Sequence, residues 1–381
     1  MNASADKLLL DLFVRLVELP SPSGRERAVA DAVLAWLRAA GLSPVEDDTA
    51  AVIGAGSGNI IVRVPAGETP PGEPGPAAPI VLAAHMDTVA VDGPVVAVVE
   101  DGVVRSATDT ILGGDDKVAV TALLAVLRDL AGSPPAAPVI GVFSTSEEIG
   151  LKGAKALDVA ALGARAGFVF DTTGPIGEII TRAPAQKTIT AEFHGVAAHA
   201  GIAPDLGRNA IAAASHAVAS MKLGRIDELT TANVGLIEGG TATNIVPERC
   251  RIVGEARSHE AASLAAQVTH MIDAVQLAAG IAGIDVETSV VDEYQAFALD
   301  DDELPVRVAA EALRALQVEP RLGPSGGGSD ANVFNLRGLP SVNLSIGMEK
   351  VHTPDEYLPV ARLGDAYRLL HAVVRAAAAA A

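Results

Sequence analysis

The stretch Ile80–Asp87, IVLAAHMD, decides how the rest of the chain is interpreted. Ile80 to Ala84 is a short, continuous apolar run, which is typical of a strand buried on both faces of a parallel sheet. His85 stands at its carboxyl end, the edge at which open α/β sheets bind their ligands. Asp87, on the same side of an extended chain, could hold one ring nitrogen of His85 and leave the other for a metal. Taken alone, the pair is equally consistent with a core histidine beside a surface aspartate.

Three other apolar runs of the chain are also followed by acidic residues or a histidine. They are Pro138–Phe143, followed by Glu147 and Glu148; Gly167–Phe170, followed by Asp171; and Ser341–Ile346, followed by a loop with His352. Because ligands gather at the carboxyl ends of parallel strands, we expect these side chains to lie beside His85. Imidazole and carboxylate donors together suit zinc, manganese or cobalt better than calcium. The sequence therefore predicts a site for two divalent metal ions.

Two metal ions roughly 3.5 to 4 Å apart need a ligand that reaches both. Asp115 is the candidate, because the Gly113-Gly114 turn lets it approach from the start of a predicted helix; an ordinary N-cap is the alternative. Glu147 and Glu148 are neighbours whose side chains diverge in an extended loop. One can bind a metal while the other faces a water molecule as general base, although a solvated turn is the alternative for the pair alone.

Composition limits the class of protein. The 381 residues are enough for two domains, and the formal net charge of −19 argues against nucleic acid and anionic membranes as partners. Cys250 is the single cysteine, which excludes an internal disulfide and fits a reducing compartment. Without a signal peptide pattern or an apolar run of membrane-spanning length, we expect a soluble, cytoplasmic protein.

The order of predicted elements indicates the fold. Up to Asp171, strands alternate with helices, which predicts an α/β class with a mostly parallel twisted sheet and helices on both faces. The segment Pro20–Gly24 is expected only to separate two N-terminal helices, and Ala66–Pro79 is expected to be a surface loop. We expect a metal-binding domain of residues 1–183 and 295–381, with an independent domain of residues 184–294 inserted into it.

The predicted inserted domain has the order βαββαβ of the ferredoxin-like α+β fold. Its expected elements are strand 187–194, helix 208–223, strands 232–237 and 244–256, helix 260–279 and strand 285–291.

Several motifs, in chain order, carry a resemblance to a known family. They are HMDT, GGDDK, STSEEIGLKGA, FDTTGPIGEI, HGVAAHAGIAPDLGRNAI, GGTATNIVPERCRIVGEARS, GGGSDANVF and VHTPDEYL. This set resembles the co-catalytic zinc metallopeptidases that include peptidase T, carboxypeptidase G, aminoacylase and succinyl-diaminopimelate desuccinylase, and it spans nearly the whole chain. The sequences of the motifs GGDDK, EEIGLKGA and FDTTGP are most similar to those of the peptidase T branch.

The resemblance implies a role for each motif residue. It implies that His85, Asp115 and Asp171 bind one zinc ion, and that Asp115, Glu148 and His352 bind the other. Asp87 would orient His85, and Glu147 would be the general base. An inserted ferredoxin-like lid that commonly dimerises is also implied, and it matches the domain order predicted above.

In the lid, the resemblance implies that His199 reaches the site of a neighbouring subunit and stabilises an oxyanion. It implies that Arg257 binds a substrate carboxylate, which suits its two-pronged donor. Surface residues are the alternative interpretation of both. Asn244 would add a polar contact, and Gly327, the centre of Gly326–Gly328, would let the backbone approach the substrate closely.

Our leading hypothesis is a two-metal aminopeptidase or tripeptidase that cleaves short peptides, with a homodimeric assembly. Zinc is the expected metal, and manganese or cobalt are possible. An N-acyl-amino-acid deacylase or amidohydrolase with the same mechanism stays open, because specificity lies in lid and loop residues. A non-catalytic, metal-binding regulatory protein is the third hypothesis, and the retention of Glu147 and of every expected ligand speaks against it.

Overall fold

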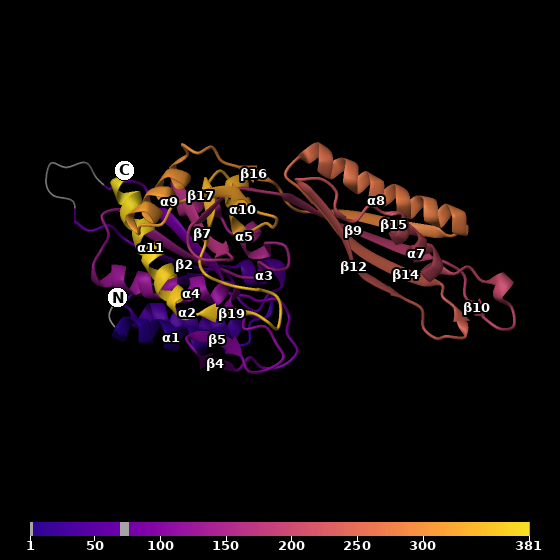
Figure 1. Ribbon diagram of the computed structural model, residues 1–381, viewed down its shortest axis with the longest axis horizontal. Coiled ribbons are helices and arrows are strands. Elements are labelled where there is room, and N and C mark those ends of the chain that lie inside the picture. The colour runs from indigo at the N-terminus through magenta and orange to yellow at the C-terminus, as the bar shows by residue number, and fades with distance from the viewer. Residues whose placement is uncertain (1–2, 69–75, 381) are drawn as a thin grey trace. The chain divides into compact units, whose positions relative to one another are not determined.

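The computed structural model describes residues 3–68 and 76–380, so part of the predicted 66–79 loop lies outside the described residues. The chain forms two compact units (Figure 1). Unit 1 runs up to Thr181 and includes Ala298–Ser325 and the chain from Ser329 onward; unit 2 comprises Arg182–Phe297 and Gly326–Gly328. Each unit has its own hydrophobic core.

Unit 1 is built on a mixed sheet with the strand order β1-β2-β6-β3-β7-β18-β8-β16, and β17 pairs with β8. The strands are β1 (Val45–Glu46), β2 (Ile60–Val64), β3 (Ile80–His85), β6 (Val139–Ser144), β7 (Ala166–Thr172), β8 (Glu178–Ala183), β16 (Phe297–Ala298), β17 (Arg321–Pro324) and β18 (Ser341–Ser345). The central strands β6, β3, β7 and β18 are parallel, whereas β2 and β8 pair with them antiparallel. All six residues of β3 are buried, as expected for a strand covered on both faces.

Helices cover the sheet of unit 1. They are α1 (Ala3–Val17), α2 (Arg27–Ala39), α3 (Thr49–Ile53), α4 (Gly114–Gly132), α5 (Lys152–Ala156), α6 (Val159–Leu162), α9 (Leu304–Ala315), α10 (Asp330–Leu336) and α11 (Ala361–Ala379). The buried helix α4 packs on β3 and β7 and is covered in turn by α1, α2 and α11. The short helix α10 packs on β7 and β18 and contacts α5 (Figure 1). A small sheet of β4 (Ala97–Glu100), β5 (Val103–Ser106) and β19 (Tyr357–Pro359) completes the unit.

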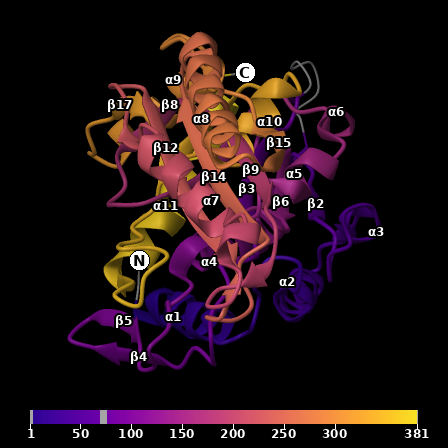
Figure 2. The same ribbon diagram turned by 90° about the vertical axis from the view of Figure 1, so that its right-hand side faces the viewer.

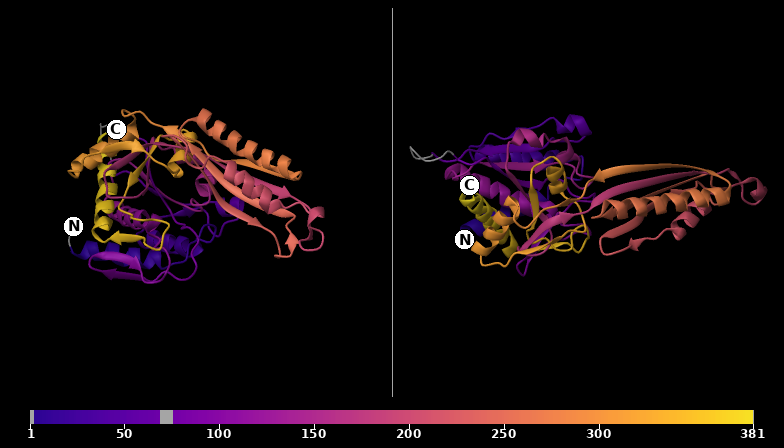
Figure 3. Two further views of the ribbon diagram at one scale, coloured as in Figure 1. Left: turned by 45° about the vertical axis from the view of Figure 1, so that its right-hand side comes forward. Right: turned by 90° about the horizontal axis from the view of Figure 1, so that it is seen from above.

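Unit 2 is a five-stranded antiparallel sheet of order β11-β12-β14-β9-β15 with two helices on one face (Figures 2 and 3). Its main elements are β9 (Ala185–His194), α7 (Ala210–Ser220), β11 (Gly224–Arg225), β12 (Thr230–Gly239), β14 (Arg249–Ser258), α8 (Ala261–Ala282) and β15 (Asp285–Tyr294). The sequence β9-α7-β12-β14-α8-β15, with β14 and β9 at the centre, is the ferredoxin-like arrangement. The predicted fold class, an α/β sheet with an inserted ferredoxin-like unit, is confirmed.

One predicted strand of unit 2 was wrong in extent. Residues 244–256 contain two strands, β13 (Ile245–Val246) and most of β14, and β13 pairs with β10 (Ala198–His199) in a separate small sheet. Pro247 lies between them and has no N–H for a ladder, so the chain changes sheet there. The turn η1 (Pro204–Leu206) follows β10.

Within residues 3–68 and 76–380, none of the helices combines the length and the apolar composition needed to cross a membrane.

Candidate metal centre

The predicted metal ligands of unit 1 come from the carboxyl ends of adjacent strands. His85 is the last residue of β3, Glu147 and Glu148 follow β6, Asp171 is the last residue but one of β7, and His352 follows β18. The strands β6, β3, β7 and β18 are neighbours in this order. Their parallel arrangement brings residues up to 267 positions apart to one edge of the sheet.

His85 is buried and has its two ring nitrogens in different surroundings. Nδ1 lies 3.0 Å from the carbonyl oxygen of Asp87 and 3.5 Å from Asp87 Oδ1, so it carries the proton and donates. Nε2 faces Asp115 Oδ1 at 3.1 Å and Asp171 Oδ1 at 3.8 Å. Asp87 therefore selects the tautomer in which Nε2 is available to a metal ion.

Asp115 lies between the two histidines. Its Oδ1 faces His85, and its Oδ2 lies 3.1 Å from His352 Nε2, which is also 2.9 Å from Glu148 Oε1. The ligand atoms of His85, Asp115 and Asp171 lie within 4.8 Å of one another, as do those of Asp115, Glu148 and His352. These are the two predicted ligand sets, and their role as ligands stays a prediction. Glu147 enters a third such group, with His85 and Glu148.

Asp115 is not a helix cap. Its backbone has φ −78° and ψ 104°, outside the helical range, and the N-cap position of α4 belongs to Gly113 at φ +75°, which favours glycine. The buried carboxylate of Glu356 accepts hydrogen bonds from the N–H groups of Gly113, Gly114 and Asp115 at 2.8 to 3.2 Å. Because Glu356 satisfies these donors, the Asp115 carboxylate is left to face the histidines.

Asp87 binds the backbone of Glu147 and Glu148 in addition to orienting His85. It is fully buried, and its Oδ1 accepts from the N–H of Glu147 at 2.9 Å. Its Oδ2 accepts from the N–H of Glu148 at 3.1 Å and from Ser23 Oγ at 2.7 Å. One carboxylate thus fixes both the orientation of His85 and the backbone of the glutamate pair.

Further residues at the site were not singled out from the sequence. Asn343 accepts from the N–H of Asp171 at 2.8 Å and donates to its carbonyl oxygen at 2.9 Å, which fixes Asp171 from the neighbouring strand β18. The buried Lys117 donates to Ser21 Oγ at 2.8 Å and to the carbonyl oxygen of Met86 at 2.7 Å. A polar residue inside an apolar strand or helix is the signal that could have identified both.

The cluster is dominated by negative charge. Burial raises the pKa of Glu147 and of Asp171 well above the usual range, and neighbouring carboxylates raise both further. Hydrogen bonds to Asp115 and Glu148 raise the pKa of His352 to about 10. Burial alone would lower the pKa of His85, but the carboxylates of Asp115 and Asp87 raise it well above its usual value. The crowded carboxylates that raise the pKa of both histidines fit a site for cations, with the donor types that divalent transition metals prefer.

Two of the predicted lid residues lie together in unit 2. His199 in β10 pairs with Ile245 in β13, and the N–H of Ala200 donates to the carbonyl oxygen of Asn244 at 2.9 Å. The N–H of Gly201 donates to His199 Nδ1 at 3.2 Å. Because Nδ1 is the acceptor, the neutral His199 ring carries its proton on Nε2 and presents a donor.

Arg257 and Gly327 form a second pair in unit 2. Arg257 donates through Nε and Nη2 to the two oxygens of Glu255, each at 3.0 Å, and Gln186 also donates to Glu255. A side chain on Gly327 would begin 3.6 Å from Arg257 Nη1. The guanidinium is therefore held in one orientation beside a bare stretch of backbone.

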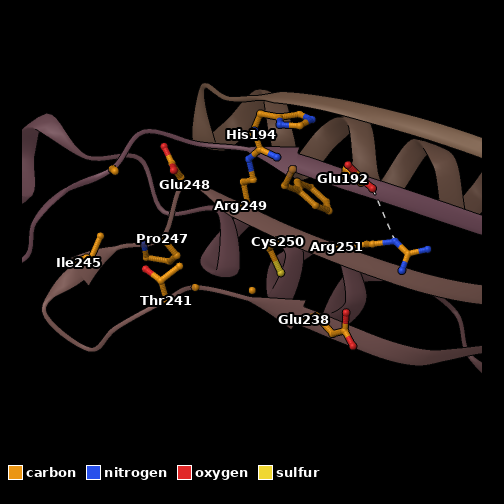
Figure 4. Close-up of a pocket in the computed structure, with 14 residues that line it drawn as sticks. Glu192, His194, Glu238, Thr241, Ile245, Pro247, Glu248, Arg249, Cys250 and Arg251 are labelled. Atoms are coloured by element: carbon orange, nitrogen blue, oxygen red, sulfur yellow. Dashed lines mark ion pairs between the residues drawn. The ribbon is translucent and has the colours of Figure 1, made fainter.

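Unit 2 has a hollow of about 460 Å³, whose lining residues are drawn in Figure 4. Thr241 and Ile245 line it on either side of Asn244 in the chain, and so do Glu192 and Arg251, which form an ion pair of 3.8 Å. Cys250 also lines it; burial raises the pKa of this thiol, which agrees with a structural role. No predicted metal ligand lines this hollow.

Comparisons with known proteins agree with this geometry. The model of peptidase family M20/M25/M40 matches residues 81–376. The Bacillus subtilis protein YqjE, described as uncharacterized, is 37% identical over 374 residues, which cover 98% of this chain and 99% of that protein. Among solved structures, aminopeptidase PepT from Bacillus cereus is 37% identical with a TM-score of 0.82, and a tripeptidase from Staphylococcus aureus is 34% identical with a TM-score of 0.87. Each alignment covers 98% of this chain and 99% of the other.

The family resemblance predicted from the motifs is therefore confirmed. The chain belongs to peptidase family M20/M25/M40, in its peptidase T-like branch.

Proposed function

We propose that this metallopeptidase is a two-metal aminopeptidase or tripeptidase that acts on short peptides. The observation that carries the proposal is the Asp115 carboxylate, which presents one oxygen to His85 and the other to His352. A second carboxylate joins each of these pairs, Asp171 beside His85 and Glu148 beside His352. The buried Glu147 lies in a group with His85 and Glu148. The solved aminopeptidase and tripeptidase structures, both above 30% identity, support peptides as substrates.

The donors fit two divalent ions, with His85, Asp115 and Asp171 holding one and Asp115, Glu148 and His352 holding the other. We propose zinc, with manganese and cobalt as alternatives, because mixed imidazole and carboxylate sets suit these ions. When bound, the ions would polarise the scissile carbonyl and lower the pKa of a water molecule to about 7.

Glu147 is the general base in this proposal. It takes a proton from the attacking water and passes it to the leaving amine, while Glu148 binds the metal. Glu148 Oε1 lies 2.9 Å from His352 Nε2, whereas Glu147 joins the group in which ligand atoms of His85, Glu147 and Glu148 lie within 4.8 Å of one another. Asp87 fixes the backbone N–H groups of both glutamates, which sets the direction of the base.

Unit 2 acts as the lid and dimerisation domain, for which we keep the boundaries 184–294. His199 donates its Nε2 proton to the oxyanion in the site of a neighbouring subunit, and Asn244 adds a polar contact. Arg257 binds the substrate carboxylate beside Gly327. The apolar side chains Ile202 and Leu206, 80% and 75% exposed, follow His199 and support a protein contact at this end of the unit. We place the homodimer in the cytoplasm.

The first experiment compares hydrolysis of a free-amine tripeptide with that of its N-acetylated form. The protein is loaded with zinc, manganese or cobalt, and a chelated sample is the control. We expect cleavage of the free tripeptide only, abolished by chelation. Preference for the acetylated peptide would move the protein to the deacylase hypothesis, and metal-loaded protein without activity on either would contradict the peptidase assignment.

A variant tests the base. Glu147→Ala should keep both metal ions and lose about 10²- to 10⁴-fold in kcat, the usual contribution of a positioned acid or base. Metal content is measured by mass spectrometry of the native protein, and kcat on the tripeptide. The exposed Glu100 of β4 gives a matched control, Glu100→Ala, which should keep full activity. Normal turnover by Glu147→Ala would remove this residue as the base.

A further inference from the structure

The segment Ser21–Glu26, between α1 and α2, contacts the site, although Pro20–Gly24 was expected only to separate two helices. Ser23 Oγ donates to the Asp87 carboxylate at 2.7 Å, and the N–H of Ser23 donates to the carbonyl oxygen of Thr88 at 3.1 Å. Ser21 accepts from Lys117 at 2.8 Å. The segment is therefore fastened to the strand end that carries His85.

Glu26 connects this segment with the loop that follows β6. Its side chain is fully buried. Oε1 accepts hydrogen bonds from the N–H and the Oγ of Ser146, both at 3.0 Å, and from the N–H of Gly24 at 2.6 Å. Within the described part of the chain, Oε2 is buried without a hydrogen-bond partner. A buried, half-satisfied carboxylate opposes stability, so stabilisation alone does not account for Glu26.

Ser146, the partner of Glu26, immediately precedes Glu147. Its φ is +53°, in the left-handed region that serine adopts only at a cost of about 1 to 2 kcal/mol. This conformation turns the chain after β6, so that the N–H groups of Gly150 and Leu151 donate to the carbonyl oxygen of Glu147. Two hydrogen bonds from Ser146 to one carboxylate oxygen hold the residue in that conformation.

The backbone of the glutamate pair is thus held from two sides. Asp87 accepts the N–H groups of Glu147 and Glu148, and Glu26 holds the residue before them. Asp87 is linked through Ser23 to the same segment as Glu26. Because the φ of Ser146 sets where the next peptide points, a change there redirects the Glu147 side chain.

We infer that Glu26 is a positioning residue for Glu147, which it aims by fixing the left-handed turn at Ser146. The inference rests on the proposed function, because Glu147 must be the base. Within the described residues, the Glu26 carboxylate accepts hydrogen bonds from Gly24 and Ser146 and from none of the predicted metal ligands, so it acts on Glu147 through Ser146. A misplacement of reacting groups by about 1 Å can cost about 10²-fold in rate.

The test uses metal-loaded, full-length protein and three variants. Glu26→Ala should lower kcat on the tripeptide by about 10- to 100-fold, with KM and the content of both metal ions unchanged. Glu26→Gln should stay close to the wild type, because its amide oxygen accepts the same donors. In the Glu26→Ala background, Ser146→Gly should restore part of the lost kcat, since glycine adopts φ +53° without the steric cost.

Asp129→Asn is the matched control for lost stability. Asp129 is a half-buried carboxylate whose hydrogen-bond partners Arg128, Tyr367 and His371 lie on α4 and α11. This variant should lose stability without losing kcat. Wild-type kcat in Glu26→Ala, or an equal loss of kcat in Asp129→Asn, would overturn the inference.

Amide hydrogen exchange separates this inference from the proposed function. Glu26→Ala should speed exchange in residues 146–151 and leave α4 unchanged, whether or not the protein cleaves the peptide. Unchanged exchange in residues 146–151 would contradict the role of Glu26 and leave the proposed function untouched. Full activity of Glu147→Ala would contradict the assignment of Glu147 as the base.

Discussion

At the scale of single residues, His199 illustrates how a backbone group decides what a side chain can do. The ring is exposed, and its Nδ1 accepts the N–H of Gly201 two residues later. Only Nε2 is then left to donate. A donor is what the stabilisation of an oxyanion requires, and a metal ligand would require the opposite.

His199→Ala should therefore lower kcat by about 10²- to 10³-fold, with metal content unchanged. His199→Gln should retain more activity, because its amide nitrogen supplies a donor near the Nε2 position. Steady-state kinetics with metal analysis of both variants test this. If His199 serves a neighbouring subunit, mixing the inactive His199→Ala and Glu147→Ala proteins should recover activity. An unaffected rate in His199→Ala would make it an ordinary surface residue.

The residues that could be predicted from the sequence share one property: each follows an apolar strand or opens a helix. His85, Asp115 and Asp171 could be identified because sheet topology places such positions together. Glu26, Asn343 and Glu356 could not, because each acts on the backbone of a segment more than a hundred residues away. A local sequence pattern cannot predict a contact between segments so far apart in the chain.

At the scale of elements, the short helix α5 supports the loop that carries Glu147. A Cβ on Gly153 would lie 2.0 Å from the carbonyl oxygen of Thr145 and 2.7 Å from Asn59 Oδ1. Asn59 itself binds the carbonyl oxygen of Gly153 and the N–H of Thr145. The helix therefore packs directly on the backbone that follows β6, and only glycine allows this approach.

Gly153→Ala should lower the free energy of unfolding by about 1 to 3 kcal/mol, the usual range for overpacking, and should also lower kcat, because the loop must move. Gly132 at the end of α4 provides the control: a Cβ there meets no atom within 4 Å, so Gly132→Ala should be neutral or slightly stabilising. Urea unfolding and tripeptide kinetics measure the two effects. Equal stability of both variants would show that α5 accommodates the extra methyl group, and would contradict the claim that only glycine fits at position 153.

The elements that were missed from the sequence are short. Helices α3, α5 and α6 have five, five and four residues, too few for a helical period to be recognised. The long helices and the central strands were recognisable because their apolar patterns run over several turns or several buried residues. The break between β13 and β14 at Pro247 was also missed, because the predicted strand 244–256 runs across this proline.

At the scale of the whole molecule, Asp129 connects α4 with α11. Burial alone would raise the pKa of Asp129, but hydrogen bonds from Tyr367 and Arg128 lower it below its usual value. The unfolded chain therefore binds this proton more readily than the folded one. The stabilisation from Asp129 is present above pH about 4 and is lost as the pH falls through the lowered pKa.

Asp129→Asn should be less stable than the wild type at neutral pH by about 1 kcal/mol, the net value of a hydrogen bond. The difference should shrink as the pH falls below 4, since the wild type then loses the same charge. Urea unfolding from pH 2.5 to 7 measures it. A difference that stays constant across this range would mean that the charge of Asp129 has no part in the stability.

The fold as a whole was accessible from the order of its elements. The alternation of strands and helices predicted the parallel sheet of unit 1, and the order βαββαβ predicted the architecture of unit 2. The two hydrophobic cores share no residue, so each pattern could be interpreted without the other. The positions at which the chain passes between the units carry no comparable pattern.

The place of β18 in the sheet has a consequence for how the protein is made. This strand, residues 341–345, lies between β7 and β8, which the ribosome delivers more than 150 residues earlier. A nascent or truncated chain without β18 leaves β7 with an open edge and lacks both Asn343, which fixes Asp171, and His352. The proposed ligand set of Asp115, Glu148 and His352 is therefore complete only after β18 and the loop that follows it have been translated.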